Sequence, residues 1–331
     1  YEIISIHIYE HVEISRAGKV WFIRMLTDTE IREMTEEIRR LAKEKDALIL
    51  AHYYQRLEVQ MAADIFGDSF ELAKKAKLAE NRMVVFCGVR FMAESAKILN
   101  PGKKVLLPAP DAGCPMADMV TPDDVLALRE KYPDAAVVCY VNSSAATKAV
   151  SDICCTSSNA VKVVKSLPNK QIIFVPDKNL GGYVARLVPE KEFILHNGFC
   201  PTHRNITAAE VDKAKAEHPG ALFAVHPECE DEVVVKADFV GSTSQIIDWC
   251  VKTDAEEFII GTEVGVVDRL SYYHPEKKYH LLTPFLVCPN MKKTELPDVL
   301  ETLRDEKNEV TMTEEEIEAA KRPLERMVAI K

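Results

Sequence analysis

The chain has 331 residues, more than one typical domain core needs, so its length alone suggests two or three units. Hydrophobic residues make up 47% and charged residues 28%, which excludes disordered, collagen-like and coiled-coil proteins. The net charge of −10 comes without a basic stripe, and the apolar runs are far shorter than the roughly 20 residues of a membrane span, so neither nucleic acid nor a membrane is expected as a partner.

The first clear structural signal follows residues 1–24, whose pattern differs from the remainder of the chain. Thr27 and Glu30 have the spacing of a capping box, which predicts the start of a helix. Apolar residues then recur at helical spacing on one face: Ile31, Met34, Ile38 and Leu41. We therefore expect the ordered protein to start near Met25 and residues 1–24 to be a dispensable leader.

From there the chain repeats one pattern three times. An apolar strand that ends in polar residues recurs as ALILAHYY (47–54), AAVVCYVN (135–142) and ALFAVHPE (221–228). A second apolar strand recurs as VVFCG (84–88), IIFVP (172–176) and FIIGT (258–262). Each repeat reads as helix, strand, loop, helix, strand, helix, strand, and each closes on a cysteine. This alternation is typical of a small parallel sheet covered by helices.

These repeats predict an α/β fold of three similar αβα three-layer units, each with a short parallel sheet, around a pseudo-threefold axis. Helix starts at Thr121 and Thr207 place the unit boundaries, which gives units at 25–120, 121–206 and 207–292. The remainder, 293–331, contains a short helix and then a capped one, and we expect these helices to pack back on the first unit.

Polar residues stand at matched positions after the first strand of each unit, where open α/β sheets bind ligands. They are His52 and Tyr54, Tyr140 and Asn142, and His226 and Glu228. Hydroxyls stand at matched helix starts, where anions are attracted: Ser69, Ser157 and Thr243. Taken singly, such a hydroxyl is usually only an N-cap and such a ring a structural group. The threefold repetition favours one shared pocket for an anionic substrate that carries several carboxylates or a phosphate.

The cysteines suggest a metal centre rather than disulfides. Nine is an odd number, no export signal is visible, and the reducing cytoplasm is the expected location. Cys114, Cys200 and Cys288 each lie in a loop and are each followed by proline, a familiar setting for cluster ligands. No CxxC pair exists, which disfavours a structural zinc site. Three thiolates fit three corners of a cubane, whose fourth iron could act as a Lewis acid.

The remaining cysteines have a simpler interpretation. Those within or beside apolar runs are expected to be core residues: Cys87, Cys139, Cys154, Cys229 and Cys250. For Cys155 both interpretations stay open.

A series of ordered motifs closely resembles the quinolinate synthase family over about residues 28–328. They are AHYYQ, GDS, FMAES, AGCPMAD, YVNSSA, CCTSSNA, PDKNLG, NGFCPTH, HPEC, GSTSQ, GTEVG and CPNM. The resemblance implies three αβα domains and one [4Fe-4S] cluster on Cys114, Cys200 and Cys288. It also implies a transferase of NAD biosynthesis, which condenses iminoaspartate (iminosuccinate) with dihydroxyacetone phosphate to give quinolinate, phosphate and two waters.

The same resemblance implies roles for the polar residues. The dicarboxylate would be bound by His52, Ser69, Tyr140, Asn142, Ser157, His226, Glu228 and Thr243. Catalysis would involve Tyr54, Glu228 and His226, with Tyr54 and Glu228 as acid and base groups. L-Aspartate oxidase, the source of the unstable imine, is a possible transient partner.

Three other functions remain open at this point. A different cluster-dependent hydro-lyase acting on a hydroxy dicarboxylate would use the same open iron and anion pocket. An electron-transfer module would usually give its cluster four protein ligands and would need no polar pocket. A metal-free protein that binds sugar phosphates would lack iron altogether.

Overall fold

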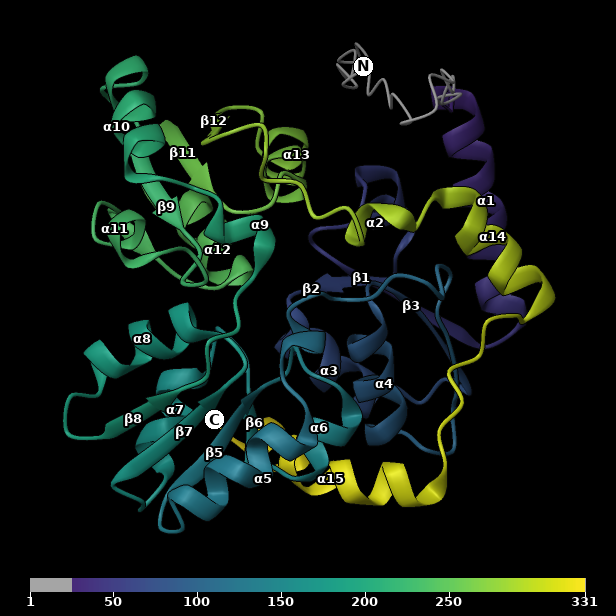
Figure 1. The fold of residues 1–331 in the computed structure, drawn as a ribbon. Helices are drawn as coiled ribbons and strands as arrows, with labels where there is room; N and C mark the ends of the chain where they lie inside the picture. The colour runs from purple at the N-terminus through teal and green to yellow at the C-terminus, as the bar shows by residue number, and fades with distance from the viewer. Residues whose placement is uncertain (1–25, 331) are drawn as a thin grey trace, which may run out of the picture.

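Each of the three repeats builds its own parallel sheet of four strands in the computed structural model, which describes residues 26–330 (Figure 1). The strand order is the same each time, with the first strand of the unit between the second and the third: β2-β1-β3-β4, β6-β5-β7-β8 and β10-β9-β11-β12. Helices flank every sheet, so the predicted fold class is confirmed. The predicted leader lies outside the described residues, and the unit boundaries stay a prediction.

The elements follow one another in the expected alternation. The first unit contains α1 (Asp28–Glu44), β1 (Ala47–His52), α2 (Leu57–Ala62), β2 (Ile65–Gly67), α3 (Ser69–Leu78), β3 (Met83–Cys87), α4 (Arg90–Leu99), β4 (Lys104–Leu106) and the 3₁₀ turn η1 (Ala117–Met119). The second contains α5 (Pro122–Lys131), β5 (Ala136–Tyr140), α6 (Ala145–Ala149), β6 (Ile153–Cys155), α7 (Ala160–Ser166), β7 (Gln171–Val175), α8 (Lys178–Leu187), β8 (Glu192–Leu195) and the short α9 (Pro201–Arg204).

The third unit and the C-terminal segment complete the chain. The third unit contains α10 (Ala208–Glu217), β9 (Leu222–Val225), α11 (Asp231–Val234), β10 (Phe239–Val240), α12 (Thr243–Lys252), β11 (Glu257–Gly261), α13 (Gly265–Tyr273) and β12 (Lys278–Leu281). The segment after it contains η2 (Met291–Lys293), α14 (Leu296–Asp305) and α15 (Glu314–Ala329).

The loop expected after the first strand of each unit is more structured than predicted. It holds a short helix and then a strand of only two or three residues: β2, β6 and β10. Such strands are too short for a hydrophobic period to reveal them. They exist because the first strand has a second edge whose backbone groups need partners.

The repeat extends to the polar contacts that hold the backbone. A capping box with a threonine N-cap opens the first helix of each unit, at Thr27, Thr121 and Thr207. An aspartate before the second strand accepts a bond from a backbone amide of the first strand, at 2.7 to 2.8 Å in each unit: Asp64, Asp152 and Asp238. A lysine before the fourth strand donates to carbonyls at the end of the third helix or just beyond it: Lys103, Lys191 and Lys277.

The C-terminal helices join the units. Figure 1 shows α14 beside α1 of the first unit, and α15 running along α4 of the first unit and α6 and β6 of the second. We expected the C-terminal helices to pack on the first unit. Helix α15 contacts the first unit and also the second. Among residues 26–330, no helix is long and apolar enough to cross a membrane.

The lysine caps lead to a test of stability. Lys277 Nζ donates to the carbonyl oxygens of Cys250 at 2.7 Å and Thr253 at 2.6 Å, at the end of α12. We expect Lys277→Met to lower the free energy of unfolding by about 2 kcal/mol, because these carbonyls lose a charged donor. Lys252→Met is the matched control, since Lys252 only pairs with Asp248 on the surface of the same helix and such a pair contributes less than about 1 kcal/mol. Urea unfolding followed by circular dichroism would measure both, and equal losses would contradict the prediction.

Candidate functional site

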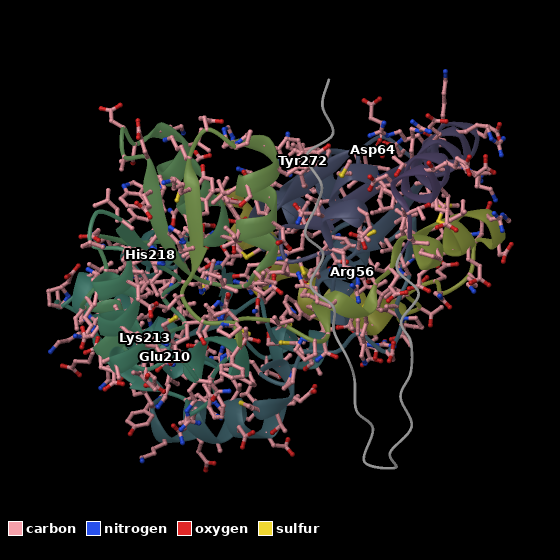
Figure 2. All side chains as sticks on the ribbon, turned by 90° about the horizontal axis from the view of Figure 1, so that it is seen from above. Arg56, Asp64, Glu210, Lys213, His218 and Tyr272 are labelled. Atoms are coloured by element: carbon pink, nitrogen blue, oxygen red, sulfur yellow. The ribbon has the colours of Figure 1, made fainter. Side chains whose placement is uncertain are left out.

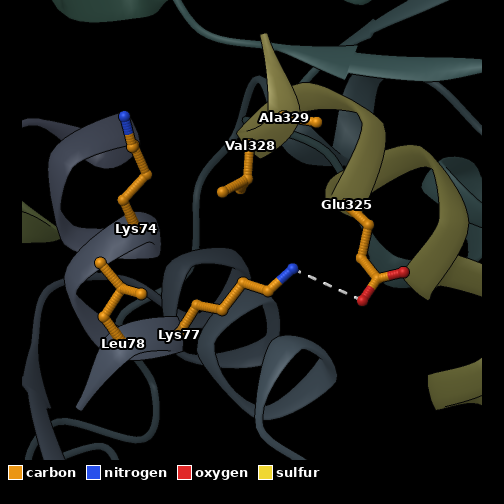
Figure 3. Close-up of a pocket in the computed structure, with 6 residues that line it drawn as sticks. All are labelled: Lys74, Lys77, Leu78, Glu325, Val328 and Ala329. Carbon is orange, nitrogen blue, oxygen red and sulfur yellow. Dashed lines mark ion pairs between the residues drawn. The ribbon is translucent and has the colours of Figure 1, made fainter. Parts of the chain in front are cut away.

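The carboxyl ends of the three sheets surround one cavity, and all twelve residues predicted for the site line it. They are His52, Tyr54, Ser69, Cys114, Tyr140, Asn142, Ser157, Cys200, His226, Glu228, Thr243 and Cys288. Asp68, His203 and Asn290 also line it. A second pocket lies between α3 and α15, where Lys77 pairs with Glu325 (Figure 3). It contains none of the predicted residues, so the candidate site is the central cavity.

Two histidines in the cavity are held in the same way. His52 Nδ1 accepts a hydrogen bond from the Tyr54 amide at 3.1 Å, and His226 Nδ1 accepts one from the Glu228 amide at 3.3 Å. Burial lowers the pKa of His52 to about 3 and the pKa of His226 to about 4, so both rings are neutral near pH 7. With Nδ1 occupied as an acceptor, the proton of each neutral ring is assigned to Nε2. Each ring is therefore an uncharged N–H donor.

The hydroxyls at the helix starts are not the caps of those helices. Asp68 caps α3, and Ser242 caps α12, so Ser69 and Thr243 are the first helical residues. The interpretation of these two hydroxyls as ordinary N-caps is therefore wrong. Ser157 differs from the prediction, because it lies in a turn just before α7, and its Oγ is 3.2 Å from His226 Nε2.

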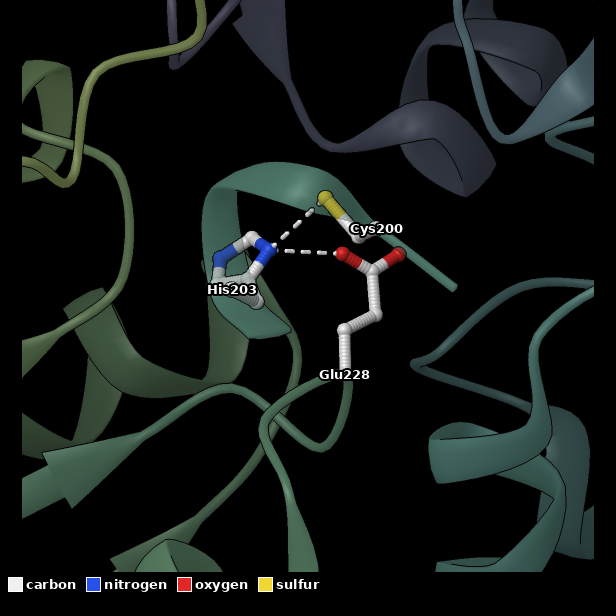
Figure 4. Close-up of side chains that lie close together, drawn as sticks. All are labelled: Cys200, His203 and Glu228. Atoms are coloured by element: carbon white, nitrogen blue, oxygen red, sulfur yellow. Dashed lines mark hydrogen bonds and ion pairs between the residues drawn. The ribbon is translucent and has the colours of Figure 1, made fainter. Parts of the chain in front are cut away.

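A chain of buried hydrogen bonds joins the two residues predicted to act as acid and base. Tyr54 Oη lies 2.7 Å from Thr262 Oγ1, which lies 3.0 Å from His203 Nε2. On its other side, His203 Nδ1 lies 2.8 Å from a carboxylate oxygen of Glu228 (Figure 4). The second oxygen of Glu228 accepts a 2.6 Å bond from the Tyr140 hydroxyl. Tyr54 and Glu228 are thus connected through Thr262 and His203.

The charge states along this chain differ from one end to the other. Burial raises the pKa of Tyr54 and of Tyr140 well above the usual value, so both phenols stay protonated. Burial also opposes ionisation of Glu228, but His226, His203 and the hydrogen bond from Tyr140 outweigh it and hold the pKa of this carboxyl below its usual range. The chain therefore runs from a neutral phenol to a carboxylate.

The three thiols come from different units and share one local design. Each cysteine is followed by proline and a short helical turn, with η1 after Cys114, α9 after Cys200 and η2 after Cys288. Backbone amides of these turns donate to the sulfurs: Met116 and Ala117, His203, and Asn290 and Met291. Cys200 Sγ also lies 3.2 Å from His203 Nδ1 (Figure 4).

These thiols fit a cationic metal group. Burial raises the pKa of Cys114 to about 12 and also raises the pKa of Cys200 and Cys288. Within the described part of the chain, no lysine or arginine lines the cavity, so no side-chain cation there favours the thiolates. A bound metal ion would supply that positive charge and deprotonate its sulfur ligands. All nine cysteines are free, and the other six, Cys155 included, are buried.

Sequence reasoning missed several members of this site. His203 stands one helical turn after Cys200 in the quoted motif NGFCPTH, so its proximity to that thiol was a usable signal. Thr262 follows β11 at the matched strand end, but nothing local indicates that it contacts Tyr54 of another unit.

Behind the cavity, a buried ion pair of the third unit also contacts the backbone of the first unit. Glu263 has no exposed side-chain surface, and its Oε1 lies 3.0 Å from Lys292 Nζ. The same carboxylate accepts a bond from the Cys288 amide at 3.2 Å, and Lys292 donates to the Tyr54 carbonyl at 2.7 Å. One ion pair thus positions the backbone of a candidate metal ligand and of a candidate acid.

Comparisons with known proteins identify relatives of this chain. A family model described as "Quinolinate synthetase A protein" matches residues 36–329. The quinolinate synthase of Alkaliphilus metalliredigens (strain QYMF) is 56% identical over 298 residues, which cover 90% of this chain and 98% of that protein. The quinolinate synthase of Aquifex aeolicus (strain VF5) is 53% identical over 310 residues, which cover 92% of this chain and 96% of that protein.

The Glu263–Lys292 pair can be tested by a double-mutant cycle. We expect Glu263→Gln to lower the free energy of unfolding by about 3 kcal/mol, because Lys292 is left nearly buried without its counter-ion. The double variant Glu263→Gln/Lys292→Met should lose less than the sum of the two single variants. Urea unfolding would measure the cycle. Glu295→Gln, which breaks the exposed pair with Arg56, is the control, and a strictly additive cycle would contradict the pairing.

Proposed function

Because this chain belongs to the quinolinate synthase family, we propose that it condenses iminoaspartate with dihydroxyacetone phosphate to form quinolinate for NAD biosynthesis. The reaction releases phosphate and two waters, which balances its atoms, and makes the enzyme a transferase. The observation that carries this proposal is the meeting of three thiols, two neutral histidines and the Tyr54–Glu228 hydrogen-bonded chain in one cavity.

The cofactor in this proposal is a [4Fe-4S] cluster held by Cys114, Cys200 and Cys288. Three partly buried thiols with amide donors to sulfur and no competing side-chain cation in the described cavity lining support it. When bound, a cluster with one iron free of protein ligands supplies Lewis acidity toward the oxygen groups of a substrate. Substrate binding and proton transfer would be carried out by side chains of the protein.

Substrate recognition would rest on neutral donors rather than on cations. His52 presents an Nε2–H group, and His226 presents one beside the Ser157 hydroxyl, so both rings can bind carboxylate oxygens without the cost of burying a second charge. Ser69 and Thr243 stand in the first turns of α3 and α12, where free amides favour anions. Asn142 Oδ1 is buried and has no hydrogen-bond partner among the described residues, so it can accept a bond from the substrate.

Proton transfer would use the two ends of the buried chain. Each loss of water needs a base that takes a proton from carbon and an acid that protonates the departing hydroxyl. The Glu228 carboxylate is suited to the first task, and the protonated phenol of Tyr54 to the second. His203 and Thr262 would then carry the proton from Glu228 back to Tyr54, so that the same pair can act again.

The imine substrate is unstable in water, which bears on how it reaches the site. The proposal therefore includes a transient contact with L-aspartate oxidase in the cytoplasm, through which the imine would pass before it hydrolyses.

Iron content tests the cluster. We expect anaerobically purified protein to contain about four irons per chain, and Cys114→Ala, Cys200→Ala and Cys288→Ala each to lose the cluster because a ligand is removed. Cys250→Ala is the control, since Cys250 is buried outside the cavity. Iron and sulfide assays with EPR of the reduced protein give the answer. A cluster that persists in all three variants would overturn the assignment.

Activity tests the base. We expect Glu228→Gln to lower kcat for quinolinate formation by about 100-fold or more, because the amide cannot accept the proton. Its iron content should equal that of the wild type. Glu230→Gln is the matched control, because Glu230 lies two positions along the chain and pairs with Lys178 and Arg204 instead. Near wild-type turnover in Glu228→Gln would remove Glu228 from the mechanism.

A further inference from the structure

A second group of potential metal ligands lies in the third unit, at the opposite end of its sheet from the cavity. His218 ends α10, Glu257 is the first residue of β11, and His280 lies in β12. The central cavity is at the carboxyl ends of the strands, whereas Glu257 is at an amino end. Figure 2 labels His218 beside Glu210 and Lys213 of α10, on the far side of the molecule from Asp64 of the first unit.

The donor atoms of this group lie close together. His280 Nε2 lies 2.8 Å from Glu257 Oε1, and His218 Nδ1 lies 3.5 Å from the same oxygen. The two imidazole rings stack with centroids 3.5 Å apart and planes 15° apart, so both present a ring nitrogen to the same carboxylate. All three donor atoms lie within 4.8 Å of one another. In a tetrahedral zinc site with bonds of 2.0 to 2.2 Å, ligand atoms are roughly 3.4 Å apart, and the two stacked rings would turn away from each other so that both nitrogens face one ion.

The internal repeat provides a comparison within the molecule. The positions that match His218, Glu257 and His280 are occupied by Tyr132, Gln171 and Ile194 in the second unit. In the first unit they are occupied by Lys45, Met83 and Leu106. Neither set could hold a metal ion, so the fold does not require ligands at these positions. The third unit alone, among the described repeats, brings three of them together.

We propose that His218, Glu257 and His280 form a surface site for a zinc-class divalent transition metal ion. Two imidazole nitrogens and one carboxylate oxygen are a donor set that zinc accepts, whereas Mg²⁺ and Ca²⁺ prefer oxygen ligands alone. Each side chain is about one third exposed, at 29%, 32% and 29%, so water can fill the fourth position. The metal would link the end of α10 to β11 and β12.

The electrostatics of the group agree with this proposal. Glu257 Oε1 lies 2.8 Å from His280 Nε2, so the carboxylate already presents an oxygen to the rings. A cation bound between the carboxylate and the two rings would replace the proton of the hydrogen bond between His280 Nε2 and Glu257 Oε1. Lys278 is exposed and can turn its ammonium group into water.

Zinc binding to the cluster-loaded enzyme tests the proposal, because the cluster occupies the cavity thiols. Equilibrium dialysis against Zn²⁺ under anaerobic conditions, with metal analysis, should show one zinc more in the wild type than in His280→Asn or Glu257→Gln. A large excess of Mg²⁺ should not displace it. His274→Asn is the matched control, since His274 forms a similar exposed pair with Glu276 in the same unit but has no second histidine.

The coordination shell gives an independent readout. X-ray absorption at the zinc edge should show nitrogen and oxygen neighbours with imidazole scattering and no sulfur. Circular dichroism and iron content should be unchanged in the variants, which excludes loss of folding as the cause. Equal zinc binding in the wild type and His280→Asn, displacement by Mg²⁺, or sulfur ligation would each overturn the site.

Discussion

Three partly buried thiols and one buried carboxylate surround a cavity whose described lining contains no lysine or arginine. This constraint governs the rest of the site, because each ionised group must obtain its stabilisation from another source. Glu228 obtains it from its contacts with His203 and the Tyr140 hydroxyl, while the sulfurs receive backbone amides from the turns after each Cys-Pro pair. Such a pocket accepts a cationic cofactor readily, and it binds anionic substrates through oriented neutral donors.

The three repeats share the contacts that hold the backbone but differ in the residues that face the cavity. The capping boxes, the strand-bonding aspartates and the helix-capping lysines recur in every unit, and they fix where each first strand ends. At those ends the residue types diverge, with His52, Tyr140 and His226 in matched positions. One backbone design repeated three times thus presents three different sets of functional groups to one cavity, which a symmetric assembly of identical units could not do.

Contacts between the first and third units hold these groups in place. Asp68 caps α3 and also accepts a bond from Ser242, the cap of α12. Arg269 stacks on Phe66, with its guanidinium carbon 3.5 Å from the ring centre. The Glu263–Lys292 pair links the Cys288 amide to the Tyr54 carbonyl. The position of Tyr54 relative to Thr243 and Thr262 therefore depends on how the two units dock, as does the hydrogen-bonded chain that begins there.

The sequence by itself determined the α/β units, the capped helix starts and the twelve residues that line the cavity, because hydrophobic period, cap spacing and internal repetition are local signals. Their individual roles stay a prediction. The tertiary structure alone decided that His203 and Thr262 connect Tyr54 to Glu228 and that the short strands β2, β6 and β10 exist. The inter-unit contacts join residues far apart in the chain, and the short strands form only against a neighbouring strand edge. Short-range sequence patterns do not specify which residues of separate units contact each other.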